Sequence, residues 1–163
     1  MDFSVRPAIV DDAEEMAIMH VQAWRESYGH LLPPEFFAKQ EAALPDRIMR
    51  YREYIAAGHR RILAHGPDGE LVGIAAAGPG RDEDSPCEVE LFMLYTLQHV
   101  HGRGVGQALV DELLGSGPAY LWVLDDNARA QAFYRRNGFA PDGVRQLCDP
   151  SWYSLPEHRM VRS

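Results

Sequence analysis

Apolar residues near the start of the chain recur at three- and four-residue steps, which is the spacing of one face of a helix. The positions on this face are Met16, Met19, His20, Ala23 and Trp24. The pattern predicts a helix that begins at Asp11 and Asp12. Asp12 and Glu15 have the spacing of a capping box, in which the two side chains satisfy backbone N–H groups of the first turn.

Shorter periodic runs divide the rest of the chain. Helices are predicted over Glu35–Lys39, from Asp46 to Gly58, after the glycine-rich turn Gly102–Gly106, and from Asn127 to Gly138. Strands are predicted at Phe3–Arg6, Arg61–His65, Glu70–Ala77, Glu88–Thr96, Tyr120–Leu124, Val144–Leu147 and His158–Val161. The order closes on one or two strands, because Pro156 comes just before the last of them. A hairpin precedes the glycine-rich turn, so we expect a mixed α/β architecture and not a strict doubly wound sheet.

Composition is that of one compact globular domain. The chain has 163 residues, of which 46% are hydrophobic and 25% charged. No apolar run is long enough to cross a bilayer and no secretory signal is recognisable, so we expect a cytoplasmic protein without a membrane partner. Cys87 and Cys148 are expected to be reduced thiols. The net charge of −8 argues against a nucleic-acid partner and favours a cationic substrate such as an amine, although an acidic balance also serves solubility.

The most informative segment is His101-Gly102-Arg103-Gly104-Val105-Gly106, between a predicted strand and a predicted helix. Its alternate glycines bare successive backbone N–H groups, and the helix adds the positive end of its dipole, which together suit a phosphate group. Arg103 adds a formal charge. A plain tight corner is the competing interpretation. Two other phosphate motifs are excluded, since no Gly-Lys-Ser/Thr follows and position 107 is glutamine.

Residues 89–114 resemble motif A of the GNAT N-acetyltransferase superfamily, whose turn reads Gln/Arg-x-x-Gly-x-Gly/Ala. His101, Gly104 and Gly106 occupy its three fixed places. The histidine departs from the family pattern. Backbone N–H groups carry most of the pyrophosphate contact, so binding should persist, with an affinity that falls as pH rises through the imidazole's titration.

Residues 127–139 are similar to motif B of the same family, N-x-x-A-x-x-F-Y-x-x-x-G-F, with all six fixed places kept. The opening strand and first helix also look like this family. The resemblance implies one domain over residues 1–163. It also implies a mixed, mostly antiparallel sheet that splays after the fourth strand, with helices on both faces.

The same resemblance implies that acetyl-CoA is the co-substrate and that main-chain groups of Met93–Thr96 bind its acyl arm. The implied cofactor-binding residues are Met93, Leu94, Tyr95, Thr96, His101, Gly102, Arg103, Gly104, Val105, Gly106, Asn127 and Tyr134. The side chains of Leu91, Met93 and Leu94 are expected to belong to the core. Asn127 has a second interpretation as a plain helix cap.

The resemblance places two catalytic candidates. Tyr134 is positioned to protonate the departing thiolate, because a phenol with a pKa of about 10 holds its proton at neutral pH. Glu90 is a candidate base on the fourth strand. Trp24, Glu26 and Tyr28 are expected to border the acceptor pocket. For Glu90, Glu26 and Tyr28 a structural or solvated role is the stronger alternative, and for Trp24 a place in the core is at least as strong. Tyr134 has a competing interpretation as a helix tyrosine packed on the sheet. No metal site is predicted, since His99 and His101 have no third ligand at a suitable spacing.

The expected function is therefore transfer of an acetyl group from acetyl-CoA to a primary amine of a small molecule or peptide. The alternative is a non-catalytic acyl-CoA-binding sensor, for which the histidine at position 101 and the undefined base leave room. Many family members pair, so a homodimer is allowed by the sequence but not required by it. The identity of the acceptor amine lies beyond the sequence.

Overall fold

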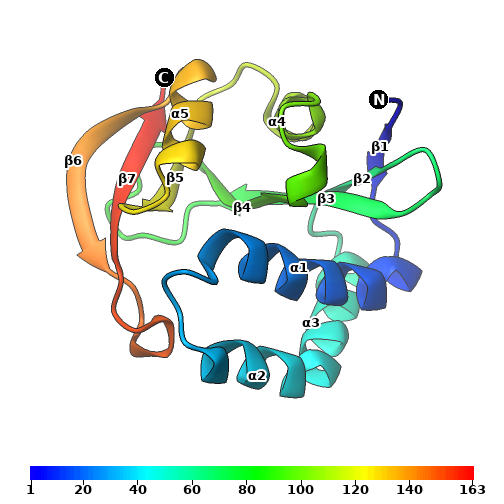
Figure 1. Cartoon of the computed structure of the whole chain (residues 1–163). Coiled ribbons are helices and arrows are strands. Elements are labelled where there is room, and N and C mark those ends of the chain that lie inside the picture. Colours follow the sequence, from blue (N-terminus) through cyan, green and yellow to red (C-terminus); the bar gives the residue numbers. More distant parts are fainter. The chain divides into compact units, whose positions relative to one another are not determined.

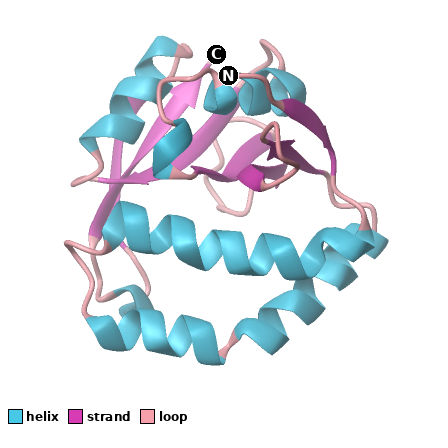
Figure 2. Cartoon of the chain, turned by 45° about the vertical axis from the view of Figure 1, so that its right-hand side comes forward, coloured by secondary structure: helices cyan, strands magenta, loops and turns pink.

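A computed structural model describes residues 1–163, and its mixture of helices and strands is visible in Figures 1 and 2. The helices are α1 (Ala13–Tyr28), α2 (Pro34–Ala42), α3 (Leu44–Ala56), α4 (Val105–Leu114) and α5 (Ala128–Arg136). The strands are β1 (Ser4–Pro7), β2 (Arg61–His65), β3 (Leu71–Pro79), β4 (Val89–Thr96), β5 (Ala119–Leu124), β6 (Ala140–Leu147) and β7 (Pro156–Arg162). No helix combines the length and the apolar character needed to span a membrane.

The chain divides into two compact units. The first consists of residues 1–77 and 93–115, and the second of residues 78–92 and 116–163. Strands β3 and β4 contribute residues to both units. The prediction of one domain over the whole chain stays a prediction.

The first unit is built on an antiparallel run of strands. β1 pairs with β2 in the register Ser4 opposite His65, and β2 pairs with β3 in the register Arg61 opposite Ala76. The second half of β4 follows as the neighbour of β3. Residues 62–64 of β2 and 71–76 of β3 are buried without interruption. Because successive side chains of a strand point to opposite faces, both faces of these strands must be covered.

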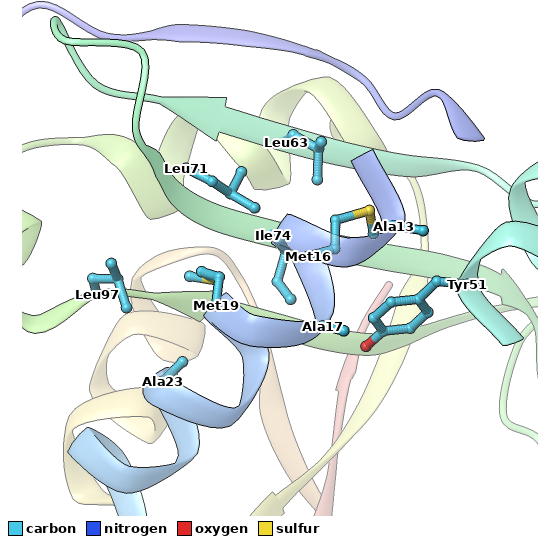
Figure 3. Packing of buried hydrophobic residues seen from close by; sticks show 10 residues of the cluster. All are labelled: Ala13, Met16, Ala17, Met19, Ala23, Tyr51, Leu63, Leu71, Ile74 and Leu97. Carbon is cyan, nitrogen blue, oxygen red and sulfur yellow. The ribbon is translucent and has the colours of Figure 1, made fainter. Parts of the chain in front are cut away.

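Helices cover both faces of these strands. On one face, apolar residues of α1 and α3 pack against β2 and β3, with Leu63 and Ile74 fully buried (Figure 3). On the other face lies α4 (Figure 1). A Cβ atom at Gly73 would lie 2.8 Å from Leu109 and 3.1 Å from Val105, both on α4. Glycine at position 73 therefore lets α4 approach the sheet closely.

The second unit combines parallel and antiparallel pairing. β5 pairs antiparallel with β7 along its whole length, from Ala119 opposite Arg162 to Leu124 opposite Glu157. β7 pairs in turn with β6. The first half of β4 pairs parallel to β5 at one register position, Glu90 opposite Tyr120. The seven-stranded, mostly antiparallel sheet and its separation after the fourth strand confirm the predicted fold class.

The predicted capping box at the start of α1 is wrong. Asp12 makes no side-chain cap; its two carboxylate oxygens accept hydrogen bonds from the Arg6 guanidinium, both at 2.8 Å. Glu15 accepts a hydrogen bond from the backbone N–H of Leu71 at 3.2 Å. Both carboxylates bind groups outside the helix, which a pattern local to the helix does not include.

Both closing strands exist and are longer than predicted. Pro156 is the first residue of β7, a position where the missing N–H removes no ladder bond inside the strand. β6 begins at Ala140, four residues earlier than the predicted start at Val144, and its register shifts between Pro141 and Arg145. Gly143 lies in this irregular stretch with φ of 89°. The irregularity interrupts the alternation of side chains, so the sequence pattern reveals only the end of the strand.

Candidate cofactor and active site

The glycine-rich turn runs directly into α4, as predicted. Gly102 and Gly104 have φ angles of 75° and 87°, a left-handed conformation that residues with a Cβ adopt rarely. Gly104 is the N-cap residue and provides no side-chain cap. The first helical bond of α4 runs from Ala108 N–H to the Gly104 carbonyl at 3.0 Å. Helix geometry thus leaves the N–H groups ahead of Ala108 without an acceptor inside α4.

The turn has the shape and polarity of an anion site. A Cβ atom placed on Gly102 or Gly104 would meet no protein atom within 4 Å. The space beside these glycines is therefore open, so an anion could approach the backbone N–H groups and the positive end of the helix dipole at the start of α4. Val105 is buried beneath the turn, while Arg103 is exposed and donates from Nε to the His99 carbonyl at 3.3 Å.

Two side chains attach the turn to the rest of the first unit. Glu26, on α1, accepts a hydrogen bond from the backbone N–H of Gln98 at 2.6 Å. His101 is half-buried, and its Nε2 lies 3.1 Å from the Thr96 carbonyl oxygen at the end of β4. Glu26 was predicted to border the acceptor pocket, and the structure places it at the entrance to the glycine turn. Its predicted contact with substrate stays a prediction.

The second half of β4 carries the main-chain groups assigned to the acyl arm. Met93 and Tyr95 project toward α1 and pack against the apolar core of the first unit. Because side chains alternate along a strand, Leu94 and Thr96 project toward the opposite face. The packing of Met93 and the burial of Leu91 agree with the expectation that these two side chains belong to the core.

Trp24 and Tyr28, two of the predicted acceptor-site residues, lie together on Tyr95. The rings of Tyr28 and Tyr95 meet edge to face with centroids 6.4 Å apart, and their hydroxyl oxygens are 3.4 Å apart. Trp24 lies edge to face with Tyr95 at 6.4 Å, and the guanidinium of Arg47 stacks over the Trp24 ring at 4.6 Å. Burial raises the pKa of Tyr95 well above its usual range, so this phenol stays protonated.

His20, one turn before Trp24 on α1, is buried with these aromatic residues. Its Nδ1 is hydrogen-bonded to the hydroxyl of Tyr51, and its Nε2 has no partner. Burial, with smaller contributions from the charges of Arg47 and Arg61, lowers the pKa of His20 to about 3. His20 is therefore neutral at physiological pH.

In the second unit, Asn127 and Tyr134 of motif B lie at the start of α5 and within it. Asn127 is its N-cap, and the side-chain Oδ1 accepts a hydrogen bond from Ala130 N–H at 3.1 Å, which confirms the capping interpretation. Tyr134 is 8% exposed, with Phe133 and Phe139 at centroid distances of 5.6 and 5.8 Å. The catalytic role of Tyr134 and the cofactor contact of Asn127 stay predictions.

Glu90 lies in the second unit as the centre of a hydrogen-bond network. It is 2% exposed, and its carboxylate accepts from the backbone N–H of Arg81 at 3.0 Å and from the Arg81 guanidinium at 2.8 and 3.1 Å. Tyr120 donates to the same carboxylate at 3.2 Å. Sequence reasoning found Glu90 but missed Arg81 and Tyr120. The only local signal was an arginine next to an acidic run in a loop after Gly78-Pro79-Gly80.

The mixed sheet and the uncapped start of α4 suit a protein that binds an anionic ligand, and similarity to known proteins names the family. Residues 21–139 match the family model "Acetyltransferase (GNAT) family". The chain is 34% identical over 141 residues to an uncharacterized N-acetyltransferase of Mycobacterium tuberculosis, covering 82% of this chain and 86% of that protein. The chain belongs to the GNAT family and is an acetyltransferase. This finding favours the enzyme over the non-catalytic sensor.

Solved structures share the fold. The PaiA N-acetyltransferase of Thermoplasma acidophilum, in complex with coenzyme A, superimposes with a TM-score of 0.76 at 17% identity, over 100% of this chain and 99% of that one. YncA of Salmonella typhimurium, solved with acetyl-CoA, gives a TM-score of 0.68 at 16% identity, over 99% of this chain and 93% of that one. At these identities the likeness establishes the fold.

Proposed function

We propose that the protein transfers the acetyl group of acetyl-CoA to a primary amine of a small molecule or peptide, which attacks the thioester directly. The observation that carries the proposal is the start of α4. There Gly104 bares N–H groups beside open space and no side chain caps the helix. A cradle of this kind fits the two linked phosphates of coenzyme A.

Main-chain groups of the first unit would do most of the binding. The N–H groups ahead of Ala108 would hold the pyrophosphate, and those of Met93–Thr96 would hold the acyl arm and polarise the thioester carbonyl. When bound, acetyl-CoA supplies an activated acetyl group with a thiolate as the leaving group. The packing of Val105 against β3 keeps the start of α4 in place for this purpose.

Side chains of the second unit would manage the proton on the leaving group. In the proposal, the Tyr134 hydroxyl donates its proton to the thiolate sulfur as the carbon–sulfur bond breaks. Asn127 would contact the cofactor through its amide nitrogen, because its Oδ1 already accepts the capping bond from Ala130. The packing of the Tyr134 ring against Phe133 and Phe139 supports the proposal, since it holds the phenol in one position.

The base that takes the amine proton is less well supported. The Glu90 carboxylate accepts four hydrogen bonds from Arg81 and Tyr120 and forms an ion pair with the Arg81 guanidinium, so binding a substrate proton would neutralise the anion of that ion pair. The catalytic role of Glu90 therefore stays a prediction, with the amine's proton passing to water as the alternative. The net charge of −8 supports an acceptor that arrives as a cation.

A turnover screen tests the proposal. Release of free thiol from acetyl-CoA is measured over a panel of small amines, amino acids and peptides, with amine-free reactions as the background. We expect acetylated product and equal thiol release for at least one amine class. Tight acetyl-CoA binding without turnover on any primary amine would contradict the proposed acceptor class.

A further inference from the structure

The contact between β4 and β5 is confined to one pair of residues. Glu90 faces Tyr120 in the parallel register, whereas β5 stays paired with β7 along its full length. Side chains that lie opposite each other in neighbouring strands project to the same face. The Tyr120 hydroxyl consequently lies 3.2 Å from Glu90 Oε2, and its one proton is shared between this oxygen and Asp82 Oδ2 at 2.9 Å. The single position where the strands pair is thus also joined by a side-chain hydrogen bond.

Arg81 closes around the same carboxylate from the β3–β4 loop. Its backbone N–H and Nε donate to Glu90 Oε2 at 3.0 and 3.1 Å, and its terminal nitrogen donates to Oε1 at 2.8 Å. The guanidinium also stacks over the ring of Phe92 at 4.3 Å. Arg81 thus contacts β4 on both sides of Leu91.

The Tyr120 hydroxyl is fixed from the loop as well. It lies 2.9 Å from Asp82 Oδ2 and 2.9 Å from Ser85 Oγ, and Tyr120 is fully buried. Burial raises the pKa of Tyr120, so the phenol keeps the proton that it donates. A Cβ atom on Gly80 would lie 2.7 Å from this hydroxyl, and one on Gly78 would lie 2.8 Å from Phe92. The two glycines make room for the network.

We infer that Arg81, Glu90 and Tyr120 form a side-chain lock that fixes the residue at which β4 parts from β5. The inference rests on the proposed function, because Met93–Thr96, which would bind the acyl arm, directly continue the same strand. The lock residues are positioning residues. They act by holding the main chain of β4 in a set conformation before the cofactor arrives, and so reduce the ordering that binding would otherwise require.

The test removes the polar group of one lock side chain at a time. Tyr120→Phe deletes the hydroxyl and keeps the ring, and Arg81→Met removes the guanidinium from a side chain that is 64% exposed. We expect the KM for acetyl-CoA to rise about tenfold while kcat changes by less than about threefold, because binding groups common to ground and transition states are affected. In the free protein, amide hydrogen exchange of residues 91–96 should quicken about tenfold.

A matched control separates the lock from general loss of stability. The buried Asp12 carboxylate accepts two hydrogen bonds from the Arg6 guanidinium, both at 2.8 Å, and neither residue belongs to the lock or to β4. Asp12→Asn should lower the free energy of unfolding and leave the KM and the exchange of residues 91–96 unchanged. The lock is refuted if Tyr120→Phe and Arg81→Met behave like Asp12→Asn.

The exchange measurement also keeps the lock distinct from the proposed function. It uses the free protein and requires no turnover. Faster exchange in the lock variants, together with absence of acetyl transfer by the wild-type protein, would uphold the lock and reject the proposed function. Unchanged exchange, together with normal transfer, would reject the lock alone.

Discussion

In each unit, one face of the strands is covered by side chains, but these are apolar in the first unit and largely polar or charged in the second. In the first unit, that face meets α1 and α3 through apolar residues such as Met16, Leu63 and Ile74 (Figure 3). In the second unit, the face that carries Tyr120 and Trp122 is occupied by charged and polar groups. Trp122 Nε1 donates to Asp82 Oδ2 at 2.9 Å, and the Arg159 guanidinium lies 6.0 Å from the centre of the Tyr120 ring.

The contrast corresponds to a difference in how each unit would serve the reaction. Apolar packing has no preferred direction, and it sets the spacing of whole elements. This suffices in the first unit, where a helix start provides main-chain donors. Hydrogen bonds are directional and fix particular atoms. The second unit would contribute through side chains, Tyr134 and the lock, whose effect depends on where one hydroxyl or carboxylate lies.

Substitution of Gly104 is the strongest test of main-chain binding in the first unit. In Gly104→Val, a branched side chain would fill the open space beside the bared N–H groups, at a φ of 87° that valine adopts poorly. We expect the affinity for coenzyme A to fall about 100-fold or more, which calorimetric titration measures.

Gly58→Val is the matched control for that experiment. Gly58, in the same unit, has a φ of 86°, and a Cβ atom there also meets nothing within 4 Å. The control therefore carries the same backbone strain away from the turn, and it should lose stability while binding coenzyme A normally. Tight binding by Gly104→Val would place the pyrophosphate elsewhere. The first unit would then no longer be the one that binds through main-chain groups.

Local signals explain what the sequence could predict. The Asn127 cap and the left-handed Gly138, with φ of 86°, lie within a few residues of the helix that they delimit. The glycine turn before α4 is equally local. Motifs A and B consist of such segments, so the fold class and the start of α4 followed from the sequence.

Long-range contacts explain what the sequence could not predict. Glu90 was recognised by its place on a strand, but Arg81 lies nine residues away and Tyr120 lies 30 residues away. No periodicity encodes that their side chains meet. Asp12 and Glu15 fit a capping box by spacing, yet their partners are Arg6 and the Leu71 backbone. A polar side chain can choose among many partners, so its spacing in sequence indicates its contacts less reliably than the spacing of apolar residues indicates a buried face.

His20 is a titratable residue within the apolar face of the first unit, so the stability of that unit should depend on its protonation. Its pKa is about 3 in the folded protein, against 6.5 for an unperturbed histidine. The unfolded chain therefore binds the proton more readily, so the stability contributed by neutral His20 is complete above pH 6.5 and is lost as pH falls toward 3. At pH 5 the loss should be about 2 kcal/mol.

Denaturant unfolding of the wild type and His20→Gln at pH 7 and pH 5 measures this effect. Subtracting the two proteins removes the contribution of the other histidines. The groups that face His20 are Arg47 and Tyr51 of α3, Arg61 of β2 and Tyr95 of β4, and they stay in one charge state over this range. A stability difference between the two proteins that is the same at both pH values would show that His20 is hydrated in the folded state.

Tyr134→Phe is the smallest of the expected effects and tests whether a side chain of the second unit takes part in chemistry. The substitution keeps the ring between Phe133 and Phe139 and removes only the hydroxyl. We expect kcat to fall at least several-fold, or about 1 kcal/mol in activation free energy, with the affinity for acetyl-CoA nearly intact. Tyr153→Phe, which alters an exposed tyrosine of the same unit, is the control. If the rate of Tyr134→Phe equals that of the control, then the leaving thiolate obtains its proton without Tyr134. In that case the side chains of the second unit, like the main chain of the first, would bind and orient the reactants without donating a proton to the leaving group.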